Sequence, residues 1–292
     1  MIDDIVATVE GLTGQAVVAR HDPPGSGYTP SIRFVAELDS GDRVFVKAPP
    51  DRHIASWIQQ EITFYRAAEG PYLPRFVGAR DATPTDRPVL VIEDLSAARW
   101  PPPWDDDAVG AVIETLGRVH ASPSGAVVTA LGAVHPTLQR GWHEVALEPT
   151  VLTRTGLCSP EWLRDVLPHF QDAVRRAPLA GDSLCHLDVR SDNLCLMADG
   201  SVRFVDWNHA CRANPDLDLA FWVPSLAHET GVEPEELGLE VDAGLAAVVA
   251  GFFAARAGLP VIPKAPRVRG VQRDLLAVAL PWAARCCGFV AP

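Results

Sequence analysis

The sequence predicts an α+β protein with two lobes, a small strand-rich lobe over residues 1–95 and a larger, mainly helical lobe over residues 96–292. Three observations support this prediction. Short β-type runs fill much of the first third of the chain, helical spacing of apolar residues dominates the rest, and a proline-rich segment over 97–104 separates the two. That segment holds three consecutive prolines and two tryptophans, which favours a stiff connector over a helix or a central strand.

The first lobe is expected to contain four strands and one helix. The first three strands are predicted at residues 16–19, 31–38 and 43–48. Residues 39–42, Asp-Ser-Gly-Asp, supply the turn between the second and third strands. Apolar residues at nearly helical spacing predict a helix over 54–68, and an apolar run predicts a short buried strand over 89–92.

The second lobe is expected to open with a helix that residues 105–107 cap and whose apolar face runs to Val119. Another helical region starts at Ser159, a capping residue followed by proline at the first helical position. Pro168 is expected to interrupt this region, which favours two short helices. The later elements are predicted as a hairpin within 184–205 and helical regions over 237–258 and 268–287.

Composition excludes several classes of function. The net charge of −12 leaves no basic field that could neutralise phosphates, which argues against a nucleic-acid partner. The six cysteines form no C-x-x-C pair, which suits neither a disulfide framework nor a zinc site. The N-terminus lacks signal-peptide features, and the longest apolar run, residues 243–255, is too short to span a bilayer. A reduced cytoplasm is the expected compartment, with no membrane partner.

One group of polar residues points to chemistry. Asp188 stands five residues before the side-chain amide of Asn193, and Asp206 follows thirteen residues later, after a β-type run. An isolated Asp is usually a turn or capping residue. Here, however, His186, Asp188, Arg190 and Asn193 agree in spacing with the hydrophobic run and its terminal Asp206. Together they predict a site for phosphoryl transfer.

Read as H-x-D-x-R-x-x-N plus V-D-W, the pattern resembles the aminoglycoside phosphotransferase and choline kinase family. The resemblance implies a bilobal protein-kinase-like fold, with ATP or GTP as co-substrate and Mg²⁺ as cofactor. It implies that Asp188 accepts the proton of the acceptor hydroxyl, while Asn193 and Asp206 hold the metal. Arg190 would neutralise charge on the transferring phosphoryl group; the alternative is a structural ion pair with Asp192 or Asp206.

Lys47 lies in an otherwise apolar predicted strand and therefore needs a partner. The resemblance implies that Lys47 contacts the α- and β-phosphates and pairs with Glu61 on the following helix. The alternative is that Lys47 sits on a strand edge and that Glu61 is a solvated helix residue.

Two further segments are expected to contact the nucleotide. Gly25, Ser26 and Gly27 lie in a loop whose small residues would let backbone N–H groups approach phosphates, although an ordinary hairpin loop is nearly as consistent with them. The resemblance implies that the backbone of Glu93 and Leu95 meets the adenine edge.

The acceptor is expected to be a small hydroxylated molecule. The interval between Asp206 and Asp218 is too short for the peptide platform of protein kinases, and the A-P-E motif is missing. Asp216, Trp222 and Glu229 are the candidate acceptor residues, because acidic groups suit an amino sugar and aromatic faces suit a sugar ring or a cation. The alternative for a tryptophan is a place in the core. His186 and Asp218 are interpreted as scaffold.

The leading functional hypothesis is an ATP- or GTP-dependent O-phosphotransferase that modifies a small molecule, such as an aminoglycoside or another amino-sugar-like compound. Its role could be antibiotic resistance or metabolism. The alternatives are a nucleotide-binding pseudokinase with a regulatory role, a kinase of choline or another metabolite, and transfer of a nucleotidyl group on the same fold.

Overall fold

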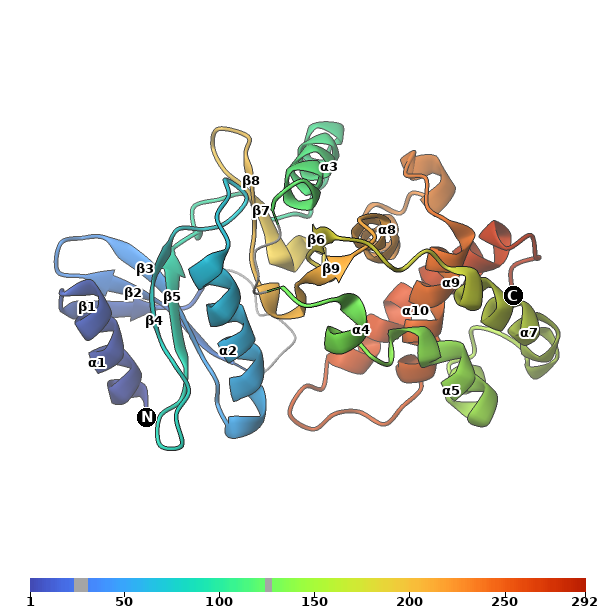
Figure 1. The fold of residues 1–292 in the computed structure, drawn as a ribbon, viewed down its shortest axis with the longest axis horizontal. Helices are drawn as coiled ribbons and strands as arrows, with labels where there is room; N and C mark the ends of the chain where they lie inside the picture. The colour runs from blue at the N-terminus through green and yellow to red at the C-terminus, as the bar shows by residue number, and fades with distance from the viewer. Residues whose placement is uncertain (24–30, 124–127) are drawn as a thin grey trace.

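A computed structural model describes residues 1–23, 31–123 and 128–292 and has the two-lobed protein-kinase-like fold that the sequence predicts (Figure 1). The small lobe is built on an antiparallel five-stranded sheet in the order β1-β2-β3-β5-β4. Its strands are β1 (Val17–His21), β2 (Ile32–Leu38), β3 (Arg43–Ala48), β4 (Phe76–Arg80) and β5 (Val89–Glu93).

The two faces of this sheet enter different cores. On β5, Val89 and Val91 join a cluster with helix α1 (Ile2–Thr13), whereas Leu90 and Ile92 join the main core with helix α2 (Arg52–Ala67). Successive strand residues point to opposite faces, so the all-apolar run of β5 fits a strand covered on both sides. The sheet thus holds β3 between two helices.

The prediction of one helix and four strands in the small lobe was wrong, because α1 and β4 were missed. α1 buries only Ile5 and Val9 of its twelve residues and ends at Gly14, whose φ is 70°. Ile2, Val6 and Leu12 pack beside them at helical spacing, so the apolar pattern of α1 was present in the sequence and was overlooked. β4 is an edge strand whose five residues are all half-buried, which removes the alternation that marks a strand.

The large lobe is mainly helical and encloses two short two-stranded sheets. Its longer helices are α3 (Asp106–His120), α5 (Gly141–Leu147), α7 (Pro160–Arg176), α8 (Asp216–Thr230), α9 (Ala243–Ala257) and α10 (Val268–Cys286). Short helices α4 (Leu131–Val134) and α6 (Thr150–Thr153) link them. The strand pairs are β6 (Ser183–Cys185) with β9 (Cys211–Ala213), and β7 (Leu194–Leu196) with β8 (Val202–Phe204).

α7 is one continuous helix through Pro168, so the expected interruption into two helices was wrong. The Ser159 side chain accepts the N–H of Trp162 and caps the start of α7. Leu163 and Phe170, on either side of the proline, are both buried in the main core. Burial of this face outweighs the single backbone hydrogen bond that proline removes.

α9 is the central helix of the large lobe and packs against α5, α7 and α10. Its backbone touches that of α5 directly: a Cβ added to Gly141 would lie 2.2 Å from the carbonyl carbon of Gly251. A Cβ added to Gly251 would lie 2.7 Å from the Trp142 ring. Both positions therefore require glycine, and the contact fixes α9 close to α5.

The segment between α9 and α10 crosses to the small lobe, and Figure 1 shows it reaching toward α2. Its Lys264 Nζ lies 2.8 Å from Asp51 Oδ2, beside the start of α2. No helix within the part of the chain that the structure describes is long and apolar enough to cross a membrane.

Candidate active site

A cavity of about 1010 Å³ is lined by residues of both lobes. Pockets for small molecules usually measure roughly 300–1,000 Å³, so this one is large enough for a nucleotide and a small acceptor together. The predicted site residues that line it are Lys47, Glu61, Glu93, Leu95, Asp188, Arg190, Asn193 and Asp206. Residues that lie far apart in the chain thus share one space.

Lys47 connects the two lobes at this cavity. Its Nζ lies 2.7 Å from Glu61 Oε2 on α2 and 2.7 Å from Asp206 Oδ1 in the large lobe. Burial alone would lower the pKa of Lys47, but the carboxylates of Asp206 and Glu61 outweigh burial and raise it. Lys47 is therefore an ammonium held between two carboxylates.

Asp206 is held as a carboxylate in an unusual backbone conformation. Burial acts to raise its pKa, yet the Lys47 ammonium lowers the pKa to about 2. Its φ of 67° is left-handed, which costs a non-glycine residue about 1–2 kcal/mol and is common where function fixes the geometry. The N–H of Val205, the preceding residue, donates to the carbonyl of Asn193 at 2.9 Å, which brings Asp206 beside Asn193.

Asn193 is oriented by Asp188. Its Nδ2 donates to Asp188 Oδ2 and to the Asp188 carbonyl, each at 2.8 Å. Because the amide nitrogen is engaged, the amide oxygen is the atom left to face a ligand. That oxygen and the Asp206 carboxylate are hard donors of the kind that Mg²⁺ prefers, so these residues fit the magnesium ion that phosphoryl transfer requires.

The loop that carries Asp188 is held from behind by Asp218 on α8. Asp218 is fully buried, and its Oδ1 and Oδ2 accept the N–H groups of Leu187 and His186 at 2.7 and 3.0 Å. Leu187 has a left-handed φ of 60°, which these hydrogen bonds offset. His186 Nε2 adds a contact of 2.8 Å to the Val205 carbonyl. The positions of Asp188 and Asp206 are thereby linked through buried polar contacts.

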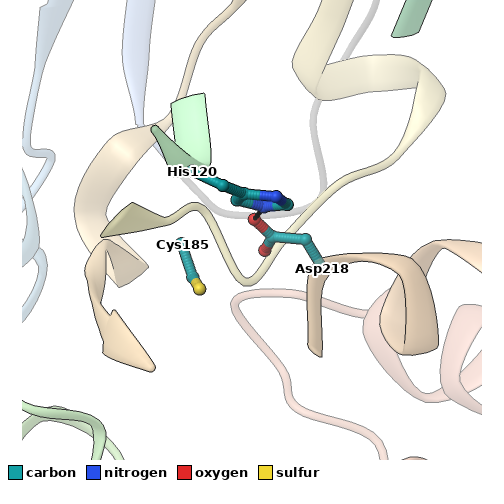
Figure 2. A group of neighbouring side chains, drawn as sticks. All are labelled: His120, Cys185 and Asp218. Carbon is teal, nitrogen blue, oxygen red and sulfur yellow. Dashed lines mark hydrogen bonds and ion pairs between the residues drawn. The ribbon is translucent and has the colours of Figure 1, made fainter. Parts of the chain in front are cut away.

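His120 and Cys185 complete this buried group (Figure 2). His120 Nε2 lies 2.9 Å from Asp218 Oδ2, so Asp218 meets three donors. His120, Cys185 and Asp218 lie close enough together to suggest a metal site. However, both Asp218 oxygens already accept backbone N–H groups of the loop, and the Cys185 thiol donates to the Asn214 carbonyl at 3.5 Å. The group is a structural support of the loop.

Arg190 lies between Asp188 and Asp192. Its Nε is 3.2 Å from Asp188 Oδ1 and 3.3 Å from Asp192 Oδ1. Of the two structural pairs that the sequence allowed, the structure contains the one with Asp192, whereas Asp206 pairs with Lys47. Burial raises the pKa of Asp192 to about 6, against the opposing effect of Arg190.

Two segments were predicted to contact the nucleotide, and the structure describes one of them. Gly25, Ser26 and Gly27 lie outside the described residues. Glu93 and Leu95 line the cavity where β5 leaves the sheet. The Leu95 carbonyl accepts the N–H of Ala98 at 3.0 Å, and the Glu93 carboxylate accepts a backbone N–H at 2.9 Å.

The three residues expected to contact the acceptor do not line the cavity. Trp222 is 0% exposed, so the expectation that it faces an acceptor was wrong. Glu229 Oε1 and Oε2 accept from Ser191 Oγ at 2.5 Å and Trp104 Nε1 at 2.7 Å, which makes Glu229 a second support of the loop that carries Asp188. Asp216 is exposed at the start of α8.

Other residues form the wall of the cavity on the side of α9 and α10. They are Trp57 from α2, Phe252 and Arg256 from α9, Ile262 from the following segment, and Val268 and Gln272 from α10. No motif or spacing in the sequence marks this set. α9 is apolar all round, so its pattern does not separate cavity-facing residues from core residues.

The fold and the grouped residues are those of a kinase-like phosphotransferase. A family model described as a phosphotransferase enzyme family matches residues 21–259, and the chain belongs to that family. A comparison with curated protein sequences found no significant match.

Solved structures resemble the chain over nearly its whole length. The GDP and kanamycin complex of APH(2″)-IIIa has a TM-score of 0.60 at 13% identity, covering 97% of this chain and 99% of that one. The aminoglycoside phosphotransferase APH(4)-Ia, in a thermostable mutant, has a TM-score of 0.58 at 14% identity, covering 97% of each chain. The choline kinase LicA of Streptococcus pneumoniae has a TM-score of 0.57 at 13% identity, covering 99% of each chain. At such identities the likeness extends to the fold only.

Proposed function

We propose that the protein transfers the γ-phosphate of ATP or GTP to a hydroxyl group of a small molecule. The observation that supports this most is that Lys47, Asp188, Asn193 and Asp206 all line one cavity between the lobes. A pseudokinase would be expected to lack at least one of them. We also propose that residues 1–95 form the nucleotide-binding lobe and residues 96–292 the catalytic and acceptor-binding lobe.

In the proposed reaction, the acceptor oxygen forms a bond to the γ-phosphorus as the bond to the β–γ bridging oxygen breaks. The acceptor proton passes to Asp188, and the nucleoside diphosphate leaves with the bridging oxygen. Asn193 keeps the Asp188 carboxylate in place through its 2.8 Å hydrogen bond. Lys47 would shift its contacts toward the α- and β-phosphates, and Glu61 would keep it oriented.

Asn193 and Asp206 would hold Mg²⁺, which neutralises charge on the phosphates when it is bound. Asp206 suits this role because it is ionised at every physiological pH. Arg190 pairs with Asp188 and Asp192, so a role on the transferring phosphoryl group would require it to exchange those partners.

An amino-sugar or choline-like acceptor, and with it a role in antibiotic resistance, draws support from the aminoglycoside and choline kinases among the structural neighbours. The residues expected to bind such an acceptor no longer support it, because Asp216, Trp222 and Glu229 do not line the cavity. We retain the cytoplasm as the proposed compartment, because ATP and GTP are available there.

The test is a screen for Mg²⁺-dependent release of ADP or GDP with aminoglycosides, choline-like alcohols, nucleosides and hydroxy acids. Mass spectrometry of the acceptor separates addition of phosphate from addition of a nucleotidyl group. Acceptor-dependent nucleotide consumption that is lost in Asp188→Asn supports the proposal. Nucleotide binding with no acceptor turnover across the screen would favour the pseudokinase.

A further inference from the structure

The residues that line the cavity fall into two sets with different chemistry. One set is Lys47, Asp206 and the β5 exit, which are the parts a nucleotide needs. The other set is Trp57, Phe252, Arg256, Ile262, Val268 and Gln272, which we call the acceptor wall. This wall is contributed mainly by α9, α10 and the segment between them, and none of its members is acidic.

The carboxylates that do line the cavity are already engaged. Lys47 pairs with Glu61 and Asp206, and Arg190 pairs with Asp188 and Asp192. The remaining three are engaged as well: Asp51 with Lys264, Asp94 with Arg43, and Glu93 with the backbone N–H of Arg75. A polycationic acceptor would therefore find no uncommitted carboxylate among the described lining residues.

Arg256 contributes a positive charge to the acceptor wall. Its guanidinium carbon lies 4.2 Å from the centre of the Phe252 ring, and its Nη1 donates to the Phe252 carbonyl at 2.9 Å. Among the described residues, no carboxylate forms an ion pair with it; Glu144 favours its charge only from a greater distance. Burial acts to lower its pKa, yet a guanidinium stays ionised in proteins.

A half-buried guanidinium without a carboxylate partner binds an anion more strongly than a fully solvated guanidinium does. The planar fork of arginine fits carboxylate and phosphate oxygens in pairs, and stacking on Phe252 holds that fork in a fixed orientation. The side chains of Trp57, Ile262 and Val268, which line the same cavity, are apolar and would cover the hydrocarbon part of a ligand.

We propose that the acceptor is an anionic hydroxyl compound with an apolar body, whose carboxylate or phosphate binds Arg256 and whose body packs on Trp57, Ile262 and Val268. The inference rests on the proposed phosphotransferase function, since the acceptor hydroxyl must reach Asp188 from the same cavity. It replaces the amine-bearing acceptor that the sequence suggested, and it deepens the proposed function by naming the substrate class.

A matched set of probes tests this directly: 4-(hydroxymethyl)benzoate, 4-(hydroxymethyl)benzyl phosphate, 4-(hydroxymethyl)benzamide and 4-(hydroxymethyl)benzylamine, with kanamycin as a polycation. Their affinities for the protein saturated with Mg²⁺ and a non-hydrolysable ATP analogue are measured by calorimetry. An anionic probe should bind at least about tenfold more tightly than the amide and the amine, as one charged bidentate contact allows. The two anions together distinguish a carboxylate site from a phosphate site.

Arg256→Gln should abolish this preference for the anion while leaving nucleotide affinity unchanged, and Arg256→Lys should retain part of it. Arg118→Gln is the matched control, because Arg118 is an exposed arginine of α3 that pairs with Glu114 and does not line the cavity. Thermal unfolding of each variant verifies that it is folded.

Stronger binding of the amine or kanamycin, equal binding of all the probes, or a preference that survives in Arg256→Gln would overturn the inference. A preference for the anion that depends on Arg256, but without transfer of phosphate to any probe, would support the inference and count against the proposed function. The two failures are thus separable, because one is read from binding and the other from product.

Discussion

Lys47 Nζ lies 2.7 Å from Asp206 Oδ1 across the boundary between the lobes, although 159 residues separate the two in the chain. Glu61 holds the same ammonium at 2.7 Å from the opposite side. The lysine that we propose contacts the nucleotide and the proposed metal ligand therefore form one electrostatic unit, because each stabilises the charged form of the other.

Lys47→Met should leave the buried Glu61 carboxylate and Asp206 without their cation. We expect the free energy of unfolding to fall by about 3–5 kcal/mol, the usual cost of breaking a buried ion pair. The double variant Lys47→Met/Glu61→Gln should recover part of that loss without recovering turnover. Denaturant unfolding and nucleotide-consumption assays on the same preparations separate the two effects. Wild-type stability in the single variant would contradict the buried pair.

Asp188→Asn should lower kcat by about 10²–10⁴, the range for loss of a general base, while leaving nucleotide affinity within about threefold of wild type. The amide keeps the size of the carboxylate but cannot accept the proton of the acceptor. Turnover and calorimetry in the presence of Mg²⁺ measure the two quantities. Asp199→Asn, in the exposed β7–β8 turn, is the control and should change neither. Normal turnover in Asp188→Asn would remove Asp188 from the proposed mechanism.

Glu229→Gln should destabilise the protein by about 1–2 kcal/mol and lower kcat, because it weakens the contacts with Ser191 and Trp104 that support the catalytic loop. It should leave the KM for the acceptor nearly unchanged. A double-mutant cycle with Ser191→Ala should be non-additive, since both changes break the same hydrogen bond. A raised acceptor KM at unchanged kcat and stability would restore Glu229 as an acceptor residue.

Asp192 should make the protein less stable as pH rises. Its pKa is raised from 3.8 to about 6, so between these values the folded state binds more protons than the unfolded state. The free energy of unfolding therefore falls between about pH 4 and 6, by at most about 3 kcal/mol. In Asp192→Asn this fall should shrink. The variant should therefore lose less unfolding free energy than wild type between pH 4 and pH 7.5. Denaturant unfolding in Mg²⁺-free, nucleotide-free buffer measures it, and equal pH profiles would contradict the raised pKa.

The fold could be predicted because its signals are local or carried by motifs. β3 and α3 begin and end within a residue or two of their expected bounds, since a turn, a capping Asp105 and apolar spacing mark them. α1 was overlooked although its apolar residues repeat at helical spacing, whereas β4, an edge strand with every residue half-buried, has no alternation to read. Local reading cannot detect an element such as β4, where packing against a neighbour rather than pattern decides the structure.

The acceptor side of the site could not be predicted for the same physical reason. Acidic character and aromatic content selected Glu229 and Trp222, but the neighbours of these residues make one a support and the other a core residue. Arg256 lies at the end of a uniformly apolar helix, where its role depends on the facing segment between α9 and α10. Spacing in the chain carries no information on such contacts between elements.

The close approach of Gly141 and Gly251 has a consequence for how this cavity could change. Gly251 directly precedes Phe252, and Arg256 follows on the same helix, so the glycine contact sets how far these two residues stand from α5. A methyl group at Gly251 would collide with Trp142, so α9 would have to shift and would carry Phe252 and Arg256 with it. The distance between Arg256 and Asp188 would then change while every residue that lines the cavity stayed the same. A substitution outside the cavity could therefore alter the length of ligand that the protein prefers.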